Sequence, residues 1–264
     1  MAIIHEPGPA GRGGRSTRAL SIQRLMDLKG LSAIDLGSKE GYNAFDLVEC
    51  GVSRALGVEV RDSFLKEAEE TRRQLGYDSV SFQKGDVRQV DELGLERFDI
   101  CLCSGLLYHM QNPFNVLKRI RNICRHLVLE THVAPTLLHY FFTGPKYRNH
   151  LQFRMREVLL DREVFRGRLN VFPLAQDMAA TSGSIANHTT FWPSLASLKK
   201  ALRLAGFEIE ALYFGSAPKG RPEILVGHGH RRTKVFLLAR VLAPEVVIAA
   251  GPSLIEGCPE LLQS

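Results

Sequence analysis

The chain has 264 residues, of which 45% are hydrophobic and 23% charged, and its formal net charge is +6. These values are ordinary for a globular protein, and the length suits one α/β domain with insertions. No apolar run approaches the ~20 residues of a membrane span, and the N-terminus lacks the apolar core of a signal peptide.

The cysteines and the positive charge say little about partners. Five cysteines, an odd number, are scattered along the chain, which is typical of reduced thiols and predicts a cytoplasmic protein. Cys101 and Cys103 lie two apart in a predicted strand and face the same way, so we interpret them as core thiols; no metal site is predicted. The net positive charge permits a polyanionic partner without establishing one.

The first 30 residues are predicted to form a basic arm and a helix. Residues 1–18 are rich in glycine and proline and carry three arginines, as a solvated tail does. Residues 20–28 have apolar side chains at helical spacing, and Lys29-Gly30 ends that helix.

The most informative stretch runs from Ser32 to Asn43. It reads as a short buried strand that ends in Asp35 and Gly37, a tight turn closed by Gly41, and the start of a helix. Such a turn brings backbone N–H groups close to a ligand at the edge of a sheet. Taken alone, the same pattern is also that of a simple tight turn.

Strands and helices then alternate, which predicts right-handed crossovers and a parallel sheet. A helix is expected from Asp62 to about Leu75, capped by Asp62 or Ser63, and another from Asn112-Pro113. The further predicted strands are 54–60, 79–87, 98–104, 126–133, 207–214 and 234–241, and a last helix is predicted over 194–205.

Residues 134–193 interrupt this alternation. They contain several aromatic residues, and seven basic residues against three acidic ones between Lys146 and Arg168. Long insertions at such a place tend to cover a substrate. The predicted domains are therefore 1–30, a main domain over 31–241 with this acceptor-side insertion, and a tail over 242–264.

Acidic residues end the first three predicted strands: Asp35, Glu59 and Asp86. In a doubly wound sheet these ends line one crevice. The second acid is placed to accept the hydroxyls of a ribose, and the third to meet an adenine amino group beside the N–H of Val87. The chain has neither Gly-x-Gly-x-x-Gly nor Gly-Lys-Ser/Thr, which argues against a dinucleotide or a triphosphate. An adenosine without phosphate points to S-adenosyl-L-methionine.

At this point the sequence resembles a known family. Asp-Leu-Gly-Ser-Lys-Glu-Gly-Tyr at 35–42, Gly85-Asp86-Val87 and Gly-Leu-Leu-Tyr-His at 105–109 are similar to motifs of class I S-adenosylmethionine-dependent methyltransferases. With 127–131 and 191–194, the resemblance narrows to the branch of tRNA wobble-uridine carboxymethyltransferases and related uncharacterised bacterial methyltransferases. It covers roughly residues 30–241. It implies an α/β fold, a Rossmann-like doubly wound seven-stranded sheet, mostly parallel with an antiparallel last strand.

The resemblance also implies site residues. The methionine part of the cofactor would lie among Asp35, Gly37, Ser38 and Gly41, and Glu59 would hold the ribose. Adenine would meet Asp86 and Val87, and the sulfonium would lie between Ser104 and Tyr108.

Two departures from the family pattern matter. Lys39 stands where the loop usually has its second glycine, so the loop is expected to approach the cofactor differently. The carboxymethyltransferases also carry a long N-terminal extension with ligands for a carboxylated cofactor, and an arginine where Lys234 falls. Because this sequence does not show that extension, plain S-adenosylmethionine is the expected cofactor.

His109 and His132 are the candidate catalytic residues, although a packed or backbone-bonding histidine would look the same in sequence. His188 is a further candidate or an ordering residue in a loop, and His228 and His230 suit a solvated turn. Trp192, beside Phe191, is a candidate for stacking on a substrate ring or a packing anchor.

Three functions remain open from the sequence. The favoured one is a methyltransferase with a small-molecule acceptor. The second is a methyltransferase acting on tRNA, which the basic stretch 146–168 favours. The third is a methyltransferase-like binding protein without activity, which Lys39 favours. No membrane partner is expected, and the oligomeric state is not predicted.

Overall fold

The computed structural model describes residues 17–137, 151–171, 189–214 and 234–242. The predictions made for the basic arm up to residue 16, for His188, for His228 and His230, and for the tail from residue 243 lie outside the described residues.

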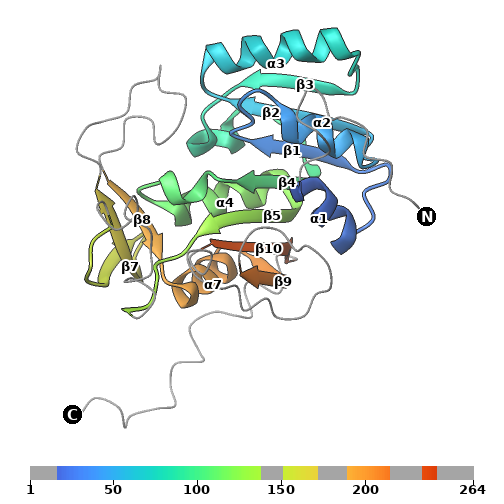
Figure 1. Cartoon of the computed structure of the whole chain (residues 1–264). Helices are drawn as coiled ribbons and strands as arrows, with labels where there is room; N and C mark the ends of the chain where they lie inside the picture. The colour runs from blue at the N-terminus through green and yellow to red at the C-terminus, as the bar shows by residue number, and fades with distance from the viewer. Residues whose placement is uncertain (1–16, 138–150, 172–188, 215–233, 243–264) are drawn as a thin grey trace, which may run out of the picture.

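The core is a seven-stranded sheet with the order β3-β2-β1-β4-β5-β10-β9 (Figure 1). Strands β1 to β5 pair in parallel, and β10 is antiparallel to both of its neighbours. The predicted sheet is thereby confirmed, including its antiparallel last strand. Its strands are β1 (Ser32–Leu36), β2 (Arg54–Glu59), β3 (Val80–Lys84), β4 (Phe98–Ser104), β5 (Cys124–His132), β9 (Phe207–Phe214) and β10 (Lys234–Val241).

Helices cover both faces of this sheet because each carries one apolar stripe. On one face the core joins α1 (Thr17–Leu25) and α2 (Tyr42–Glu49). On the other face it joins α4 (Pro113–Ile123) and α7 (Leu195–Leu204). Helix α3 (Asp62–Leu75) packs against β2 and β3. Two short 3₁₀ turns, η2 (Val87–Glu92) and η3 (Leu107–His109), follow β3 and β4.

The starts of α4 and α7 follow the capping rules. The Asn112 side chain accepts a hydrogen bond from the Asn115 N–H at 3.0 Å, with Pro113 as the first helical residue. Ser194 likewise accepts from the N–H of Ser197 at 3.1 Å. The predicted cap of α3 is wrong: Arg61 is the N-cap, and Asp62 is already helical. There Asp62 complements the helix dipole.

A second, three-stranded sheet lies within the predicted insertion. Its order is β6 (Arg156–Leu160), β7 (Glu163–Val171) and β8 (Thr189–Pro193), all antiparallel. A two-residue turn of Asp161 and Arg162, with φ of 51° and 68°, joins β6 to β7. Periodicity alone did not predict these strands, because their exposed positions mix apolar and charged side chains (Leu159, Val164, Arg166).

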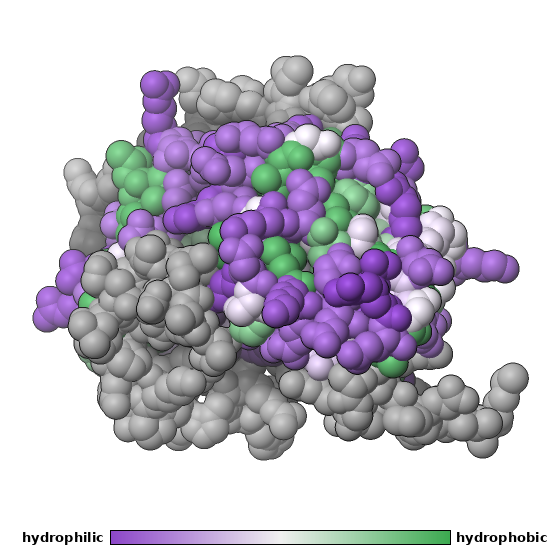
Figure 2. Space-filling model, turned by 90° about the horizontal axis from the view of Figure 1, so that it is seen from above, coloured by the Kyte–Doolittle hydropathy of each residue, from purple (hydrophilic) through white to green (hydrophobic). Residues whose placement is uncertain are grey.

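The small sheet lies beside the end of the main sheet where the parallel strands finish (Figure 1). Backbone hydrogen bonds join the two: Phe191 donates to Met110 and Ala134 donates to Pro193. Seen from the side of α3, the described surface is mainly hydrophilic, with apolar areas interspersed (Figure 2). Within the described ranges, no helix is long and apolar enough to span a bilayer.

Candidate active site

One face of the main sheet collects the polar residues at its carboxyl edge. Partners in register point to the same side of a sheet. Asp35 is in register with Leu102, Ser104 with Glu130, and Lys234 with His132. Residues two apart in a strand also share a face, so all of these lie on the side covered by α1 and α2. The main sheet therefore presents acids, a hydroxyl, an imidazole and an amine along one edge.

Asp35 and Ser38 each bury a polar atom that has no partner. Asp35 is 1% exposed and Ser38 5% exposed. The Asp35 Oδ2 and the Ser38 Oγ make no hydrogen bond, although the Asn43 side chain bonds to Asp35. Burial raises the pKa of Asp35 from 3.8 to about 7. Buried polar atoms normally have partners, so this pair fits a bound polar ligand.

The loop after β1 has the backbone shape that glycines permit. Gly37 and Gly41 have φ of 70° and 84°. A Cβ on Gly41 would lie 2.4 Å from the Phe82 ring, so this position is closed to a side chain. Lys39 also has a positive φ, of 50°. The loop therefore does not change its backbone conformation where Lys39 replaces the usual glycine. Lys39 itself adopts the left-handed conformation that glycine favours.

Glu59 closes this loop from β2. Its carboxylate is 3% exposed and accepts backbone N–H bonds from Lys39 at 3.1 Å, Val60 at 2.9 Å and Arg61 at 3.0 Å. The Arg61 guanidinium lies 3.7 Å away. The acid at the end of β2 thus holds the loop in place at the carboxyl edge of the sheet.

Asp86 and Val87 follow β3. The Asp86 side chain caps η2 by accepting from the Arg88 N–H at 2.8 Å, and its carboxylate also pairs with the Arg88 guanidinium. Burial acts to raise the pKa of Asp86, but the bonds from Arg88 lower it below its usual value. Val87 is 7% exposed.

Four aromatic rings gather near the carboxyl ends of β4 and β5. His132 stacks on Trp192 with ring centres 4.8 Å apart and an interplanar angle of 12°. Tyr108 meets His132 edge to face at 4.6 Å and His109 at 4.3 Å. The Trp192 Nε1 donates to the Tyr108 carbonyl at 3.1 Å. The structure thus brings both candidate catalytic histidines together with Tyr108 and Trp192.

Both imidazoles are held neutral at physiological pH. Burial lowers the pKa of His109 to about 4, and the charges of Lys39 and Arg61 act in the same direction. Burial likewise lowers the pKa of His132 to about 4, with a further lowering by Lys234. A base with so low a pKa takes up a proton weakly at pH 7, so these rings are better suited to accept hydrogen bonds than to deprotonate an acceptor.

An ion triad below these rings includes residues that the sequence did not single out. Glu130, 2% exposed, receives two bonds from Arg18, from Nε at 3.2 Å and from Nη2 at 3.1 Å. The Lys234 Nζ lies 2.6 Å from the same carboxylate, and the Ser104 Oγ lies 3.4 Å from it. Burial acts to raise the pKa of Glu130, but its two cations lower it. Only the fold brings residue 18 to residue 130.

One arginine of the basic stretch is unsuited to the RNA contact considered from sequence. Arg168 is 1% exposed and donates to the carbonyls of Pro135 at 3.1 Å and Gln152 at 3.0 Å. It is thus a packing residue of the small sheet. In the part of the chain that the structure describes, no three His, Cys, Asp or Glu side chains are grouped to hold a metal ion.

Comparison with known proteins gives a family for the first half of the chain. Residues 27–149 match the model of a methyltransferase domain family. A tRNA U34 carboxymethyltransferase of Photobacterium profundum is 28% identical over 114 residues, covering 42% of this chain and 35% of that protein. The corresponding protein of Klebsiella pneumoniae (strain 342) is 30% identical over 119 residues, with 43% and 34% covered. The chain thus matches only about a third of these relatives' length.

Solved structures extend the likeness to most of the chain. The N-terminal domain of EvdMO1, crystallised with S-adenosylhomocysteine (SAH) and D-fucose, has a TM-score of 0.58 and 21% identity, with 85% of this chain and 82% of that one covered. An S-adenosylmethionine dependent methyltransferase from Mesorhizobium loti has a TM-score of 0.53 and 19% identity, with 85% and 98% covered. At this identity the likeness is one of fold. The family match and the seven-stranded sheet together show that the chain carries a class I methyltransferase domain.

Proposed function

We propose that the protein transfers a methyl group from S-adenosylmethionine to a small-molecule acceptor. The observation that carries this proposal is the pair of buried, unpartnered polar atoms on the glycine loop, Asp35 Oδ2 and Ser38 Oγ, next to the acid that ends β2. The methyltransferase domain match and the SAH-bound structural relatives support the choice of cofactor.

The residues present fit the cofactor. In the proposal, Asp35, Ser38 and the backbone of Gly37 and Gly41 hold its methionine part, and Glu59 accepts the ribose hydroxyls. The adenine-side residues are Asp86 and Val87, and the sulfonium-side residues are Ser104 and Tyr108. When bound, the cofactor supplies an activated methyl group, and the protein contributes mainly alignment.

The acceptor would lie over β4, β5 and β10, below the small sheet. Tyr108 and the neutral imidazoles of His109 and His132 lie there, packed against the buried Trp192. Their proposed role is to bind and orient the acceptor, with the two histidines accepting hydrogen bonds from it.

A tRNA acceptor is the second candidate, since the curated relatives are named for tRNA U34. Four arginines of the basic stretch are exposed, at 154, 156, 162 and 166, but Glu157, Asp161 and Glu163 lie among them. With the buried Arg168 left aside, these exposed arginines exceed the acids among them by one positive charge (four minus three). A small-molecule acceptor is therefore favoured. A binding protein without activity is the third candidate, resting on Lys39.

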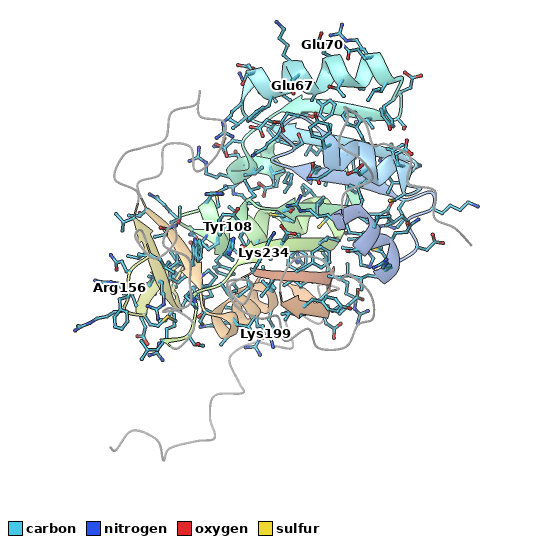
Figure 3. The ribbon with its side chains drawn as sticks, in the orientation of Figure 1. Glu67, Glu70, Tyr108, Arg156, Lys199 and Lys234 are labelled. Atoms are coloured by element: carbon cyan, nitrogen blue, oxygen red, sulfur yellow. The ribbon has the colours of Figure 1, made fainter. Side chains whose placement is uncertain are left out.

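Calorimetric titration with SAH, followed by Glu59→Ala, tests the cofactor assignment. Removing a charged hydrogen-bond partner typically costs about 1.5–3 kcal/mol, so affinity is expected to fall roughly 10- to 150-fold. Glu67→Ala is the matched control, because Glu67 is an exposed carboxylate on α3, far from the crevice (Figure 3).

Two outcomes would count against this function. An unchanged affinity in Glu59→Ala, with the thermal midpoint preserved, would show that the cofactor lies elsewhere. A wild-type protein that binds neither SAH nor S-adenosylmethionine at millimolar concentration would exclude the methyltransferase function altogether.

A further inference from the structure

Two cations from distant parts of the chain cover one buried carboxylate at the acceptor side. Glu130 is 2% exposed, whereas the side chains of Arg18 and Lys234 keep 35% and 25% exposure. The carboxylate therefore lies beneath and the cations lie above it, toward solvent. Two positive charges on one negative charge leave this triad with a net charge of +1.

A cluster of aromatic rings adjoins the triad, in which Trp192 is buried and Tyr108 and His109 are partly exposed. Lys234 is the register partner of His132 across β10 and β5, and His132 stacks on Trp192. Tyr108 and Lys234, the first residue of β10, both lie in the middle of the molecule, whereas Arg156 and Lys199 lie toward the outside (Figure 3). The acceptor side thus places positive charge next to the partly exposed rings of Tyr108 and His109.

The same site is poor in basic groups that take up a proton at neutral pH. Both imidazoles have a pKa of about 4, chiefly because they are buried. An alcohol or an ammonium acceptor needs a base to remove its proton, whereas an oxygen that is already ionised does not. A site with positive charge and no strong base therefore favours an acceptor whose oxygen is already ionised.

We propose that the acceptor is a small molecule with a flat apolar body and an ionised oxygen, of the aromatic carboxylate type, and that Lys234 and Arg18 hold its charge. This proposal rests on the proposed methyl transfer. One acceptor oxygen forms a bond to the methyl carbon with its own electron pair, and the carbon–sulfur bond breaks with its pair remaining on sulfur. The products are a methyl ester and SAH, and no proton needs to be removed.

A purely structural role for the triad, tying α1 to β5, is the competing explanation. It predicts that variants change stability but show no preference among ligands. The test therefore compares ligands of one shape and different charge on the folded, SAH-loaded protein.

The experiment measures binding of benzoate, of the neutral isostere benzamide, and of 4-nitrophenolate, by ligand-observed NMR at fixed ionic strength with saturating SAH. Benzoate is expected to bind at least tenfold more tightly than benzamide, and the 4-nitrophenolate arm shows whether a carboxylate is required or any ionised oxygen suffices. Lys234→Gln is expected to weaken benzoate at least fivefold and leave benzamide unchanged. Lys199→Gln, an exposed lysine change on α7, should alter neither.

The outcomes separate this proposal from the function on which it rests. Loss of SAH binding in the wild-type protein would overturn the proposed function. Normal SAH binding with benzoate and benzamide bound equally, or with benzoate unaffected by Lys234→Gln, would overturn the acceptor assignment alone. If Lys234→Gln does not fold, the test rests on two other measurements: the ratio of benzoate to benzamide affinity in the wild-type protein, and the same ratio in Lys234→Arg. The arginine variant keeps the positive charge and should keep the preference for benzoate.

Discussion

Asp35 combines burial with a carboxylate oxygen that lacks a partner. Its carboxylate lies at the end of β1, within the influence of Glu59 and Asp46, which also raise its pKa. Because the folded-state pKa of about 7 lies above the ordinary 3.8, the unfolded chain ionises first as the pH rises. The free protein therefore loses stability from this residue between about pH 4 and pH 7. A bound cation would offset this loss.

Asp35 leads to a prediction about pH. If its carboxylate meets the ammonium group of the cofactor, SAH affinity should rise with pH up to about 7, with a slope approaching tenfold per pH unit below that value, because the ionised form is the one that pairs. Calorimetry between pH 5.5 and 8.5 measures this, with Asp35→Asn as the control, which should flatten the profile. If the SAH affinity of the wild-type protein is equally independent of pH, Asp35 does not contact the ligand.

At the scale of elements, the glycine loop depends on backbone conformation more than on residue identity. Lys39 is exposed and holds φ of 50°, while its N–H donates to Glu59. A non-glycine residue in the left-handed region costs about 1–2 kcal/mol of folding free energy. Glycine avoids this cost, but its more flexible unfolded state cancels part of the stabilisation.

Lys39→Gly is therefore expected to raise the free energy of unfolding by up to about 1 kcal/mol and to change SAH affinity less than threefold. Urea denaturation and calorimetry check the two parts. The inactive-protein alternative makes the opposite prediction, namely that SAH binds only after this lysine is replaced by glycine.

The small sheet is the element that we expect to act as a cover. Trp192 reaches from β8 to Tyr108 and His132, so ligand binding at those rings should stabilise β7 and β8. Hydrogen exchange over residues 151–171 should be faster than in β4 without ligand and should slow when SAH is added. Protection equal to that of β4 in both states would contradict a lid.

At the scale of the whole molecule, the net charge of +6 does not concentrate into a polyanion-binding face on β6 and β7. Arg168 is buried there, and acidic side chains lie among the exposed arginines. Charge that is interspersed in this way supports solubility more than phosphate tracking.

We accordingly expect no specific, salt-sensitive tRNA binding. If Arg154, Arg156, Arg162 and Arg166 each neutralised a phosphate, the log–log salt slope would be roughly 0.7–0.9 per contact, a loss well over tenfold between about 50 and 200 mM salt. Filter binding across that range, repeated with an Arg154→Ala/Arg156→Ala pair, tests this. A tight complex that weakens with salt and in the double variant would favour the tRNA acceptor instead.

Much of the architecture could be predicted from local pattern. The strands over 98–104, 207–214 and 234–241 match their predicted bounds, because apolar runs between turn residues specify buried strands with little help from context. The acids that end the first three strands were recognisable for the same reason, since strand order and period place them at one edge. The position of these acids along one edge of the sheet was thus predictable from the sequence alone, whereas their role in holding the cofactor stays a prediction.

Tertiary structure alone decided the acceptor side. The ion triad joins residues 18, 130 and 234, and the stacked pair joins His132 to Trp192; no local pattern encodes contacts across such separations. The small sheet was not predicted because its exposed positions carry both apolar and charged side chains, so its strands lack a clear alternation of apolar and polar residues. The sequence also left open whether Lys39 is compatible with the usual conformation of the loop. The φ angle of Lys39 depends on the hydrogen bond from its N–H to Glu59, which forms only in the folded protein.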